Sequence, residues 1–367
     1  MKFTIHREQL LKPLQQVAAV VEKRQTLPVL SNLLLQVNGQ QLSMTGTDLE
    51  LELVASLPLE GAVEEGATTV PARKLVDIAR SLPANAEIRF ELDGERMKVS
   101  SGRSRFSLST LPAQEFPNLE EGQANTRFTI APDTLRSLID RTAFSMAQQD
   151  VRYYLNGMLF ELMADRLRTV ATDGHRLALC EFTLSQPVDQ DVAVILPRKG
   201  VMELGKILGD ASEDVTFSIG VNHVHLVIGS MTFTSKLVDG KFPDYERVIP
   251  RQGSRNMVSD RETLRQALTR VAILSNEKFR GVRVNLSDGN FVVVANNPEQ
   301  EEAVEEISVD FSGESLEIGF NVGYLLDILN TIEGTRVEVE LGDSNSSALI
   351  RDPENVGAQY VVMPMRL

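Results

Sequence analysis

Three stretches of this chain begin alike: FTIHREQLLKPLQQV at residues 3–17, FTIAPDTLRSLIDRT at residues 128–142 and VSDRETLRQALTRV at residues 258–271. The second copy starts 125 residues after the first, and the third starts 130 residues after the second. This spacing exceeds the roughly 20–50 residues of a solenoid repeat, so the repeated unit is a whole domain. Three like domains in one chain are typical of a scaffold that curves or closes.

The spacing predicts domains at residues 1–122, 127–250 and 251–367. Each has about 120 residues, which is enough to bury a core of its own. The stretches near residues 120–127 and 250–256 are polar, short and contain glycine, so we expect them to link the domains in a fairly fixed arc.

Each half of a domain shows one order of elements, a helix followed by several strands. The first helix is predicted from Leu10, Leu14, Val17 and Val21, which share one face at helical spacing. In the stretch TDLELELVASL, leucines alternate with glutamates from Leu49 onward, which is typical of a half-buried antiparallel strand. We therefore predict an α+β fold in which helices cover one side of antiparallel sheets.

Local signals mark where further helices begin and where the last strand ends. Pro71 suits the first position of a helix, and the Pro-Arg-Lys opening recurs at Pro197. Ser259 and Glu262 have the spacing of a capping box. The last strand is predicted to run through AQYVVMPMRL to the C-terminus.

The composition excludes several classes of protein. No apolar run reaches the roughly 18 residues of a transmembrane helix, and the N-terminus lacks the apolar region of a signal peptide. Cys180 is the only cysteine, so no disulfide forms within the chain, and we expect a buried thiol in a cytoplasmic protein. We predict no metal, no cofactor and no membrane association.

The net charge of −14 argues against nucleic acid when the chain is read as a whole. The predicted helices nevertheless carry more basic than acidic side chains, so the remainder is strongly acidic. If all helices face one side, that side can attract a polyanion while the opposite side repels it. The alternative is that lysine and arginine simply favour helices.

The most specific stretches are TLPVLSNLLLQV, TTVPARK, QDVRYYLNGMLFE, VATDGHRLA, FTSKLVDGKFPDY and YVVMPMRL. In this order, from Met1 to Leu367, the chain resembles the bacterial DNA polymerase III beta subunit, the sliding-clamp family. The resemblance implies three clamp domains per chain and a head-to-tail dimeric ring, with helices inside and sheets outside. It also implies a non-catalytic processivity factor that encircles double-stranded DNA without reading its sequence.

The resemblance assigns DNA contacts to a small set of basic, amide and aromatic side chains. For the tyrosine pair the alternative is core packing, although an exposed tyrosine can also stack on an unpaired base. Arg80 and Arg198 are further candidates. The assigned residues are Arg24, Arg73, Gln149, Tyr153, Tyr154 and Lys199.

A second implied site, called here the peptide site, binds short apolar peptides. The expected partners are the polymerase III alpha subunit, the clamp loader delta subunit, and other polymerases and repair proteins. The chain end VVMPMRL supports this site, because methionine-rich surfaces accommodate varied partners. The tail could instead only complete a sheet, or do both. The peptide site comprises Leu155, Thr172, Gly174, His175, Arg176, Leu177, Pro243, Arg247, Val248, Val361, Val362, Met363, Pro364 and Met365.

The resemblance also implies a dimer interface in which Ile273 and Leu274 pack on Phe106 and Leu108 of the other copy. Arg103 and Arg105 are expected to face the acidic run that contains Glu299, Glu301 and Glu302. Exposed ion pairs contribute about 0–1 kcal/mol each, so apolar contacts should dominate. The acidic run could also be a solvated loop.

Two other functions are compatible with parts of the sequence. An enzyme is suggested by Asp48, Asp173 and His175 in TDLE and TDGHR, but the Thr-Asp pair occurs in two repeats and is better explained as a turn. A monomeric peptide-binding scaffold would share the peptide site but lack the basic face and the dimer interface.

Overall fold

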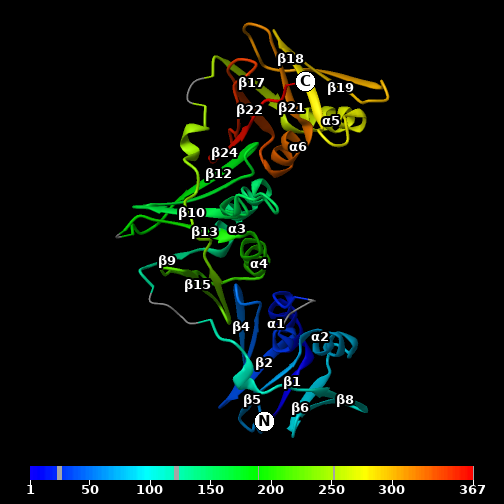
Figure 1. Ribbon diagram of the computed structural model, residues 1–367, viewed down its shortest axis with the longest axis vertical. Helices are drawn as coiled ribbons and strands as arrows, with labels where there is room; N and C mark the ends of the chain where they lie inside the picture. The colour runs from blue at the N-terminus through cyan, green and yellow to red at the C-terminus, as the bar shows by residue number, and fades with distance from the viewer. Residues whose placement is uncertain (23–26, 120–123, 189, 251–252, 367) are drawn as a thin grey trace. The chain divides into compact units, whose positions relative to one another are not determined.

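A computed structural model describes residues 1–22, 27–119, 124–188, 190–250 and 253–366. These residues form two compact units, Met1–Leu135 with Met202–Leu237, and Arg136–Val201 with Val238–Leu367 (Figure 1). The predicted middle domain is thus divided between them, and the three domain boundaries stay a prediction. The α-helices among the described residues are α1 (Arg7–Ala19), α2 (Ala72–Ser81), α3 (Pro132–Asp140), α4 (Arg198–Leu208), α5 (Arg261–Val271) and α6 (Val322–Thr331).

The first unit contains two antiparallel sheets. The four-stranded sheet has the order β1-β6-β7-β8, and the eight-stranded sheet has the order β5-β2-β3-β4-β16-β15-β14-β9. The strands of the smaller sheet are β1 (Lys2–His6), β6 (Glu87–Asp93), β7 (Arg96–Ser101) and β8 (Ser104–Ser109). Those of the larger sheet are β2 (Asn32–Asn38), β3 (Gln41–Thr47), β4 (Leu51–Pro58), β5 (Gly66–Pro71), β9 (Thr126–Ile130), β14 (Val215–Ile219), β15 (His223–Ile228) and β16 (Met231–Lys236).

The second unit repeats this plan. Its eight-stranded sheet has the order β13-β10-β11-β12-β24-β23-β22-β17, and its four-stranded sheet has the order β20-β19-β18-β21. The larger sheet contains β10 (Gly157–Met163), β11 (Arg166–Thr172), β12 (Arg176–Thr183), β13 (Val192–Pro197), β17 (Arg255–Asp260), β22 (Arg336–Leu341), β23 (Ala348–Asp352) and β24 (Asn355–Val362). The smaller sheet contains β18 (Gly281–Ser287), β19 (Asn290–Asn296), β20 (Glu302–Ser308) and β21 (Leu316–Asn321).

Each eight-stranded sheet is made of two four-stranded halves from different repeats. In the first unit β4 pairs with β16, and in the second unit β12 pairs with β24, both antiparallel. The strands at the corresponding positions of the four-stranded sheets are β20, which matches β4 and β12, and β8, which matches β16 and β24. Both lie at sheet edges within the part of the chain that is described.

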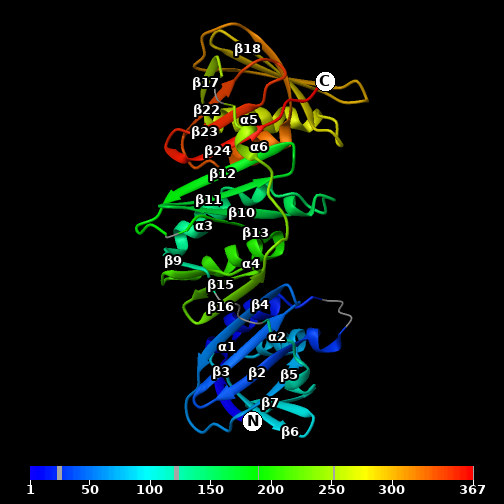
Figure 2. The ribbon, with the colours of Figure 1, turned by 60° about the vertical axis from the view of Figure 1, so that its left-hand side comes forward.

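Helices pack in pairs against these sheets. In the first unit α1 contacts α2 and the strands β3 and β4, and in the second unit α5 contacts α6, β19 and β20 (Figures 1 and 2). The first residue of each leading helix reaches the end of its neighbour: Arg7 donates to the carbonyl of Ala79, and Arg261 donates to those of Leu329 and Gly334. These two arginines satisfy carbonyls that the helix end leaves without partners.

The predicted α+β order is confirmed, but several boundaries were wrong. Helix α1 ends at Ala19, so Val20 rather than Val21 is fully buried. Leu49 lies in a turn with φ of 79°, and β4 begins only at Leu51. The leucine–glutamate alternation hid this turn, because leucine disfavours positive φ.

Three termini also differ from the sequence prediction. Pro71 is the last residue of β5 and the N-cap of α2, one position before the helix. The predicted capping box is wrong: Ser259 lies in β17, and Asp260 caps α5 by accepting from the backbone of Thr263. The last strand ends at Val362, before the terminal methionines. None of the described helices combines the length and the apolar character needed to cross a membrane.

Candidate functional site

The turn between β11 and β12 is built by a threonine and an aspartate. Thr172 donates its hydroxyl to the carbonyl of Arg176 at 2.6 Å and accepts from the N–H of Gly174 at 3.1 Å. The Asp173 carboxylate accepts from the N–H groups of His175 and Arg176. Gly174 has φ of 88°, a conformation in which glycine is unstrained. The turn therefore fixes the start of β12 and the direction of its first side chains.

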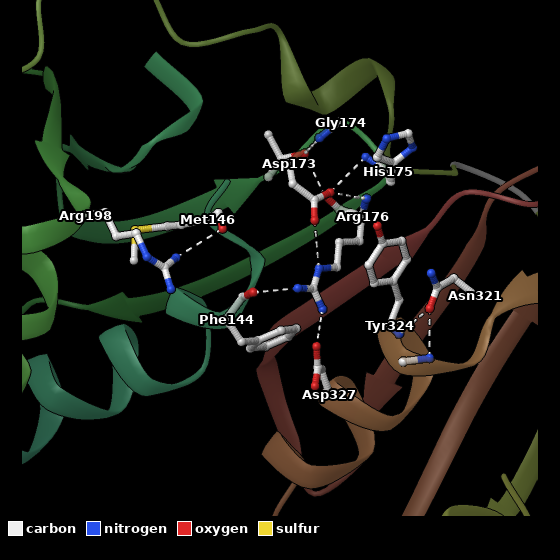
Figure 3. A network of polar contacts seen from close by, with 12 residues as sticks. Phe144, Met146, Asp173, Gly174, His175, Arg176, Arg198, Asn321, Tyr324 and Asp327 are labelled. Carbon is white, nitrogen blue, oxygen red and sulfur yellow. Dashed lines mark hydrogen bonds and ion pairs between the residues drawn. The ribbon is translucent and has the colours of Figure 1, made fainter. Parts of the chain in front are cut away.

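Arg176 extends from this turn into a network of polar contacts (Figure 3). Its Nε donates to Asp173 at 3.0 Å, and its two terminal nitrogens donate to Asp327 of α6 at 2.5 Å and to the carbonyl of Phe144 at 2.8 Å. The guanidinium carbon lies 4.5 Å from the ring centre of Tyr324. This cation–π contact adds to the attraction of the two carboxylates.

The chain end is attached at two points. The Met363 N–H donates to the carbonyl of His175 at 2.9 Å, and the Met365 N–H donates to the carbonyl of Gly319 in β21 at 2.8 Å. The His175 ring stacks on Tyr324 with centres 6.4 Å apart. The side chain of Met363 is 36% exposed, so the tail presents apolar surface next to the turn.

The loop after β16 packs against the eight-stranded sheet of the second unit. Phe242 and Tyr245 are buried there in one apolar cluster, with their rings edge to face. The Tyr245 hydroxyl donates to Glu161 and accepts from Arg168 at 2.7 Å. Burial and the hydrogen bond to Glu161 raise the pKa of Tyr245 to about 12. The loop that carries Pro243, Arg247 and Val248 is thus held by both apolar and polar contacts.

The structure brings much of the predicted peptide site together. Leu177 and Val361 face each other across β12 and β24 and lie in the same apolar cluster, against which Val248 packs. Leu155 and Val362 are buried, whereas His175 and Arg247 are exposed. Pro364 and Met365 are half-buried at the chain end. Arg247 forms an ion pair with Asp244, which keeps its charge within its own loop.

The predicted DNA contacts lie on several elements. Arg73 is exposed on α2 together with Lys74 and Arg80, and Lys199 is half-buried on α4. Arg198, a further candidate, is also half-buried and donates to the carbonyl of Met146, and burial lowers its pKa. Arg24 lies outside the described residues.

The tyrosine pair has two different environments. Tyr153 is 56% exposed, while Tyr154 packs against the apolar cluster, and their rings meet edge to face. Gln149 is exposed on the same loop with φ of 56°. Tyr153 is therefore accessible to a ligand. Tyr154 is partly packed into the core, as the alternative for the tyrosine pair expected.

The predicted dimer residues lie at the two edge strands. Ile273 is 76% exposed in the short helix η6 (Ala272–Leu274), which contacts β20, and Leu274 is half-buried. In β8, Phe106 is half-buried and Leu108 is buried within its own unit. The sequence reading missed Phe279 and Val304, each 57% exposed in the second unit.

The Thr-Asp pairs are structural, as the sequence interpretation held. Asp48 accepts from the N–H groups of Glu50 and Leu51, in the manner of Asp173. Within the described residues, no group of three or more His, Cys, Asp or Glu side chains is placed to bind a metal ion. Sequence reasoning missed Tyr324 and Asp327, because nothing local to α6 indicates that their partner is Arg176, which lies 151 residues before Asp327.

Three family models match most of the chain. Models of the DNA polymerase III beta subunit match the chain as N-terminal, central and C-terminal domains, over residues 1–120, 129–244 and 246–366. The chain therefore belongs to the DNA polymerase III beta subunit family, and it has the three domains and antiparallel sheets of that family.

Proteins similar to this chain over its full length are beta sliding clamps. The clamp of Pseudomonas aeruginosa is 58% identical over 367 residues, and that of Escherichia coli strain K12 is 55% identical over 367 residues; each comparison covers 100% of both chains. A crystal structure of the Pseudomonas aeruginosa clamp bound to griselimycin covers 100% of both chains with a TM-score of 0.98 and 58% identity. The function is that of a sliding clamp, a non-catalytic processivity factor of DNA polymerase III.

Proposed function

We propose that two copies of this chain close head to tail into a ring around double-stranded DNA, and that the peptide site tethers polymerases to it. The observation that carries the ring is the way each eight-stranded sheet is assembled. Strand β4 meets β16, and β12 meets β24, so the same joint is built twice within one chain. The remaining edge strands, β20 and β8, would form the same joint between copies, which gives a head-to-tail interface that can close.

The register of the internal joint predicts the register between copies. Phe233 of β16 faces Leu53 of β4, and the corresponding positions are Phe106 in β8 and Ala303 in β20. This register brings Phe106 to the β20 edge, where η6 presents Ile273. Apolar contact across this joint supports the predicted dimer interface.

A disulfide tests this register. Thr234 faces Glu52 in the internal joint, and the corresponding pair is Ser107 and Glu302. A chain carrying Ser107→Cys and Glu302→Cys should form a covalently closed dimer on oxidation, while each single variant should stay uncrosslinked. Cys180 is buried and should not interfere. A double variant that does not crosslink contradicts the head-to-tail joint. One that forms only open oligomers supports the joint but contradicts closure of the ring.

Retention on DNA tests encirclement. The clamp loader and ATP would load the protein onto a nicked circular plasmid, and half of the sample would then be linearised before gel filtration. We expect retention on the circle and loss from the linear form, because a ring holds DNA by topology rather than by affinity. Equal retention on both forms would indicate ordinary binding. Failure to load with an active loader would favour a peptide-binding scaffold without DNA.

We propose that the DNA contacts come from Arg73 and Lys199 on the helices and from the loop that contains Gln149, Tyr153 and Tyr154. Arg24, which lies outside the described residues, stays a candidate from the resemblance alone. On α2, Leu75 and Ala79 are buried while Arg73 and Lys74 are exposed, so this helix presents a basic surface. Neutralising Arg73 and Lys74 should reduce the salt dependence of DNA binding by about one power of salt concentration per charge. Lys98→Ala, an exposed sheet residue paired with Asp93, is the matched control and should not change it.

The peptide site would receive apolar segments of the alpha subunit, the delta subunit, and other polymerases and repair proteins. Support comes from the exposed Met363 beside the buried cluster that contains Leu177 and Val361. Griselimycin, bound by the Pseudomonas aeruginosa clamp, is proposed to bind here too. We place this activity in the cytoplasm, on the replicating nucleoid. Met363→Asp should abolish delta binding without changing the dimer, because it introduces a charge into an apolar contact.

A further inference from the structure

Arg176 was predicted to contact peptides, yet its guanidinium is enclosed by the protein. Its side chain is 11% exposed, and each of its three nitrogens donates a hydrogen bond within the chain. The rings of Tyr324 and Phe144 lie 4.5 and 5.4 Å from the guanidinium carbon (Figure 3). The charge of Arg176 is therefore used to connect elements, and little of it faces solvent.

The connected elements are the two that anchor the chain end. The His175 carbonyl, next to Arg176, accepts from Met363, and the Gly319 carbonyl in β21 accepts from Met365. Strand β21 leads directly into α6, which carries Asp327. The contact between Arg176 and Asp327 thus joins the turn to the β21–α6 segment, and the tail joins the same two segments. Together they form a closed circuit of contacts.

We propose that Asp327 is a positioning residue for the peptide site, acting through Arg176 although it is not one of the fourteen predicted site residues. This inference rests on the proposed peptide-binding function. The ion pair holds the carbonyls of His175 and Gly319 at the separation that the tail spans. That separation sets the orientation of the Met363 side chain. When the ion pair is lost, the tail keeps its hydrogen bonds but samples more orientations, so a bound peptide leaves faster.

Binding of the purified clamp loader delta subunit, followed by surface plasmon resonance on the full-length dimer, tests the proposal. Asp327 is half exposed, so Asp327→Asn should weaken binding only about fivefold, with the change in the dissociation rate. Arg176→Gln should weaken binding about tenfold. The double variant should match Arg176→Gln rather than multiply the two effects, because both substitutions open one circuit.

A matched control separates positioning from general loosening. Arg141 is 16% exposed and pairs with Glu333, just beyond α6, at 3.0 Å. This ion pair also links residues from the central and C-terminal family segments, but its partners lie outside the circuit. Glu333→Gln should change delta affinity less than about twofold. Asp327→Glu, which restores the charge, should recover most of the lost affinity, a rescue that a merely steric role would not give.

Two failures can be told apart. If Met363→Asp leaves delta binding intact, the peptide site itself is wrong, and the inference fails with it. If Met363→Asp abolishes binding but Asp327→Asn leaves it at the wild-type level, the positioning role alone is overturned. Equal losses for Asp327→Asn and Glu333→Gln would also overturn it, because they would reflect loosening of the whole segment.

Discussion

Two turns of this molecule have the same pattern of hydrogen bonds but lead into strands that begin with different side chains. In the first unit Thr47 donates to the carbonyl of Leu51 at 2.9 Å, as Thr172 donates to that of Arg176 in the second. Asp48 and Asp173 each accept two N–H groups from the residues that follow. Both turns precede the strand that joins two sheet halves, β4 or β12. What differs is the first side chain of that strand.

That side chain decides what each joint can do. Leu51 is 2% exposed and takes part in packing alone. Arg176 binds Asp173 and Asp327 and so ties the strand to a distant helix. A hydrophobic contact is non-directional, whereas a charge-assisted hydrogen bond fixes geometry. The first joint therefore gives cohesion, while the second also gives the defined positions that a binding site requires.

Exchanging the side chains of Leu51 and Arg176 should lower the free energy of unfolding by unequal amounts. Leu51→Arg places a charge in an apolar position and should lower the free energy of unfolding by about 3–5 kcal/mol. Arg176→Leu leaves Asp327 partly solvated and should cost about 1–2 kcal/mol. Urea unfolding followed by circular dichroism would measure both. Equal costs would show that the two joints are not chemically distinct.

The threonines test the shared part of the comparison. Thr47 is 1% exposed, and it accepts from the Leu49 N–H at 3.1 Å. Thr47→Val should cost about 2 kcal/mol, because buried backbone groups lose their partners. Thr172 is half-buried, so Thr172→Val should cost about 1 kcal/mol, since water can replace its hydroxyl. The same urea titrations would measure both variants, and a larger loss for Thr172→Val would reverse this ranking.

The sequence predicted the repeats, the helical faces and the turn role of the Thr-Asp pairs from local pattern alone. Leu10, Leu14 and Val17 are buried as their spacing required. It did not predict that the turn at Thr47 and Asp48 extends through Leu49, because the leucine–glutamate alternation of a strand already begins there. The role of Asp327 was also out of reach, since an exposed helical aspartate looks the same whether or not a distant arginine meets it. The residues of the DNA, peptide and dimer sites came from the resemblance.

The central residue of each turn provides a smaller test. Leu49 has φ of 79° and packs beside a cluster that contains Val29 and Leu30, whereas Gly174 has φ of 88°. Leu49→Gly should change stability little, because relief of about 1 kcal/mol of backbone strain offsets the lost packing. Gly174→Ala should cost about 1 kcal/mol, since the new Cβ also meets the Arg152 guanidinium at 3.0 Å. Thermal unfolding midpoints would measure both effects. A Gly174→Ala variant that is more stable than the wild type would contradict the strain argument.

The last test concerns pH. The pKa of Tyr245 is raised to about 12 by burial and by its hydrogen bond to Glu161, so the folded state favours the neutral phenol. Its contribution to stability is complete below about pH 10, where the unfolded tyrosine is also neutral, and is lost as the pH rises through about 12. Tyr245→Phe should lower stability by about 1 kcal/mol at neutral pH through the lost hydrogen bonds. It should then lose less stability than the wild type on alkalinisation, as unfolding at a series of pH values would measure. Parallel curves would mean that Tyr245 titrates alike in both states. The polar attachment of its loop would then be weaker than the contacts to Glu161 and Arg168 indicate, and apolar packing alone would hold this side of the peptide site.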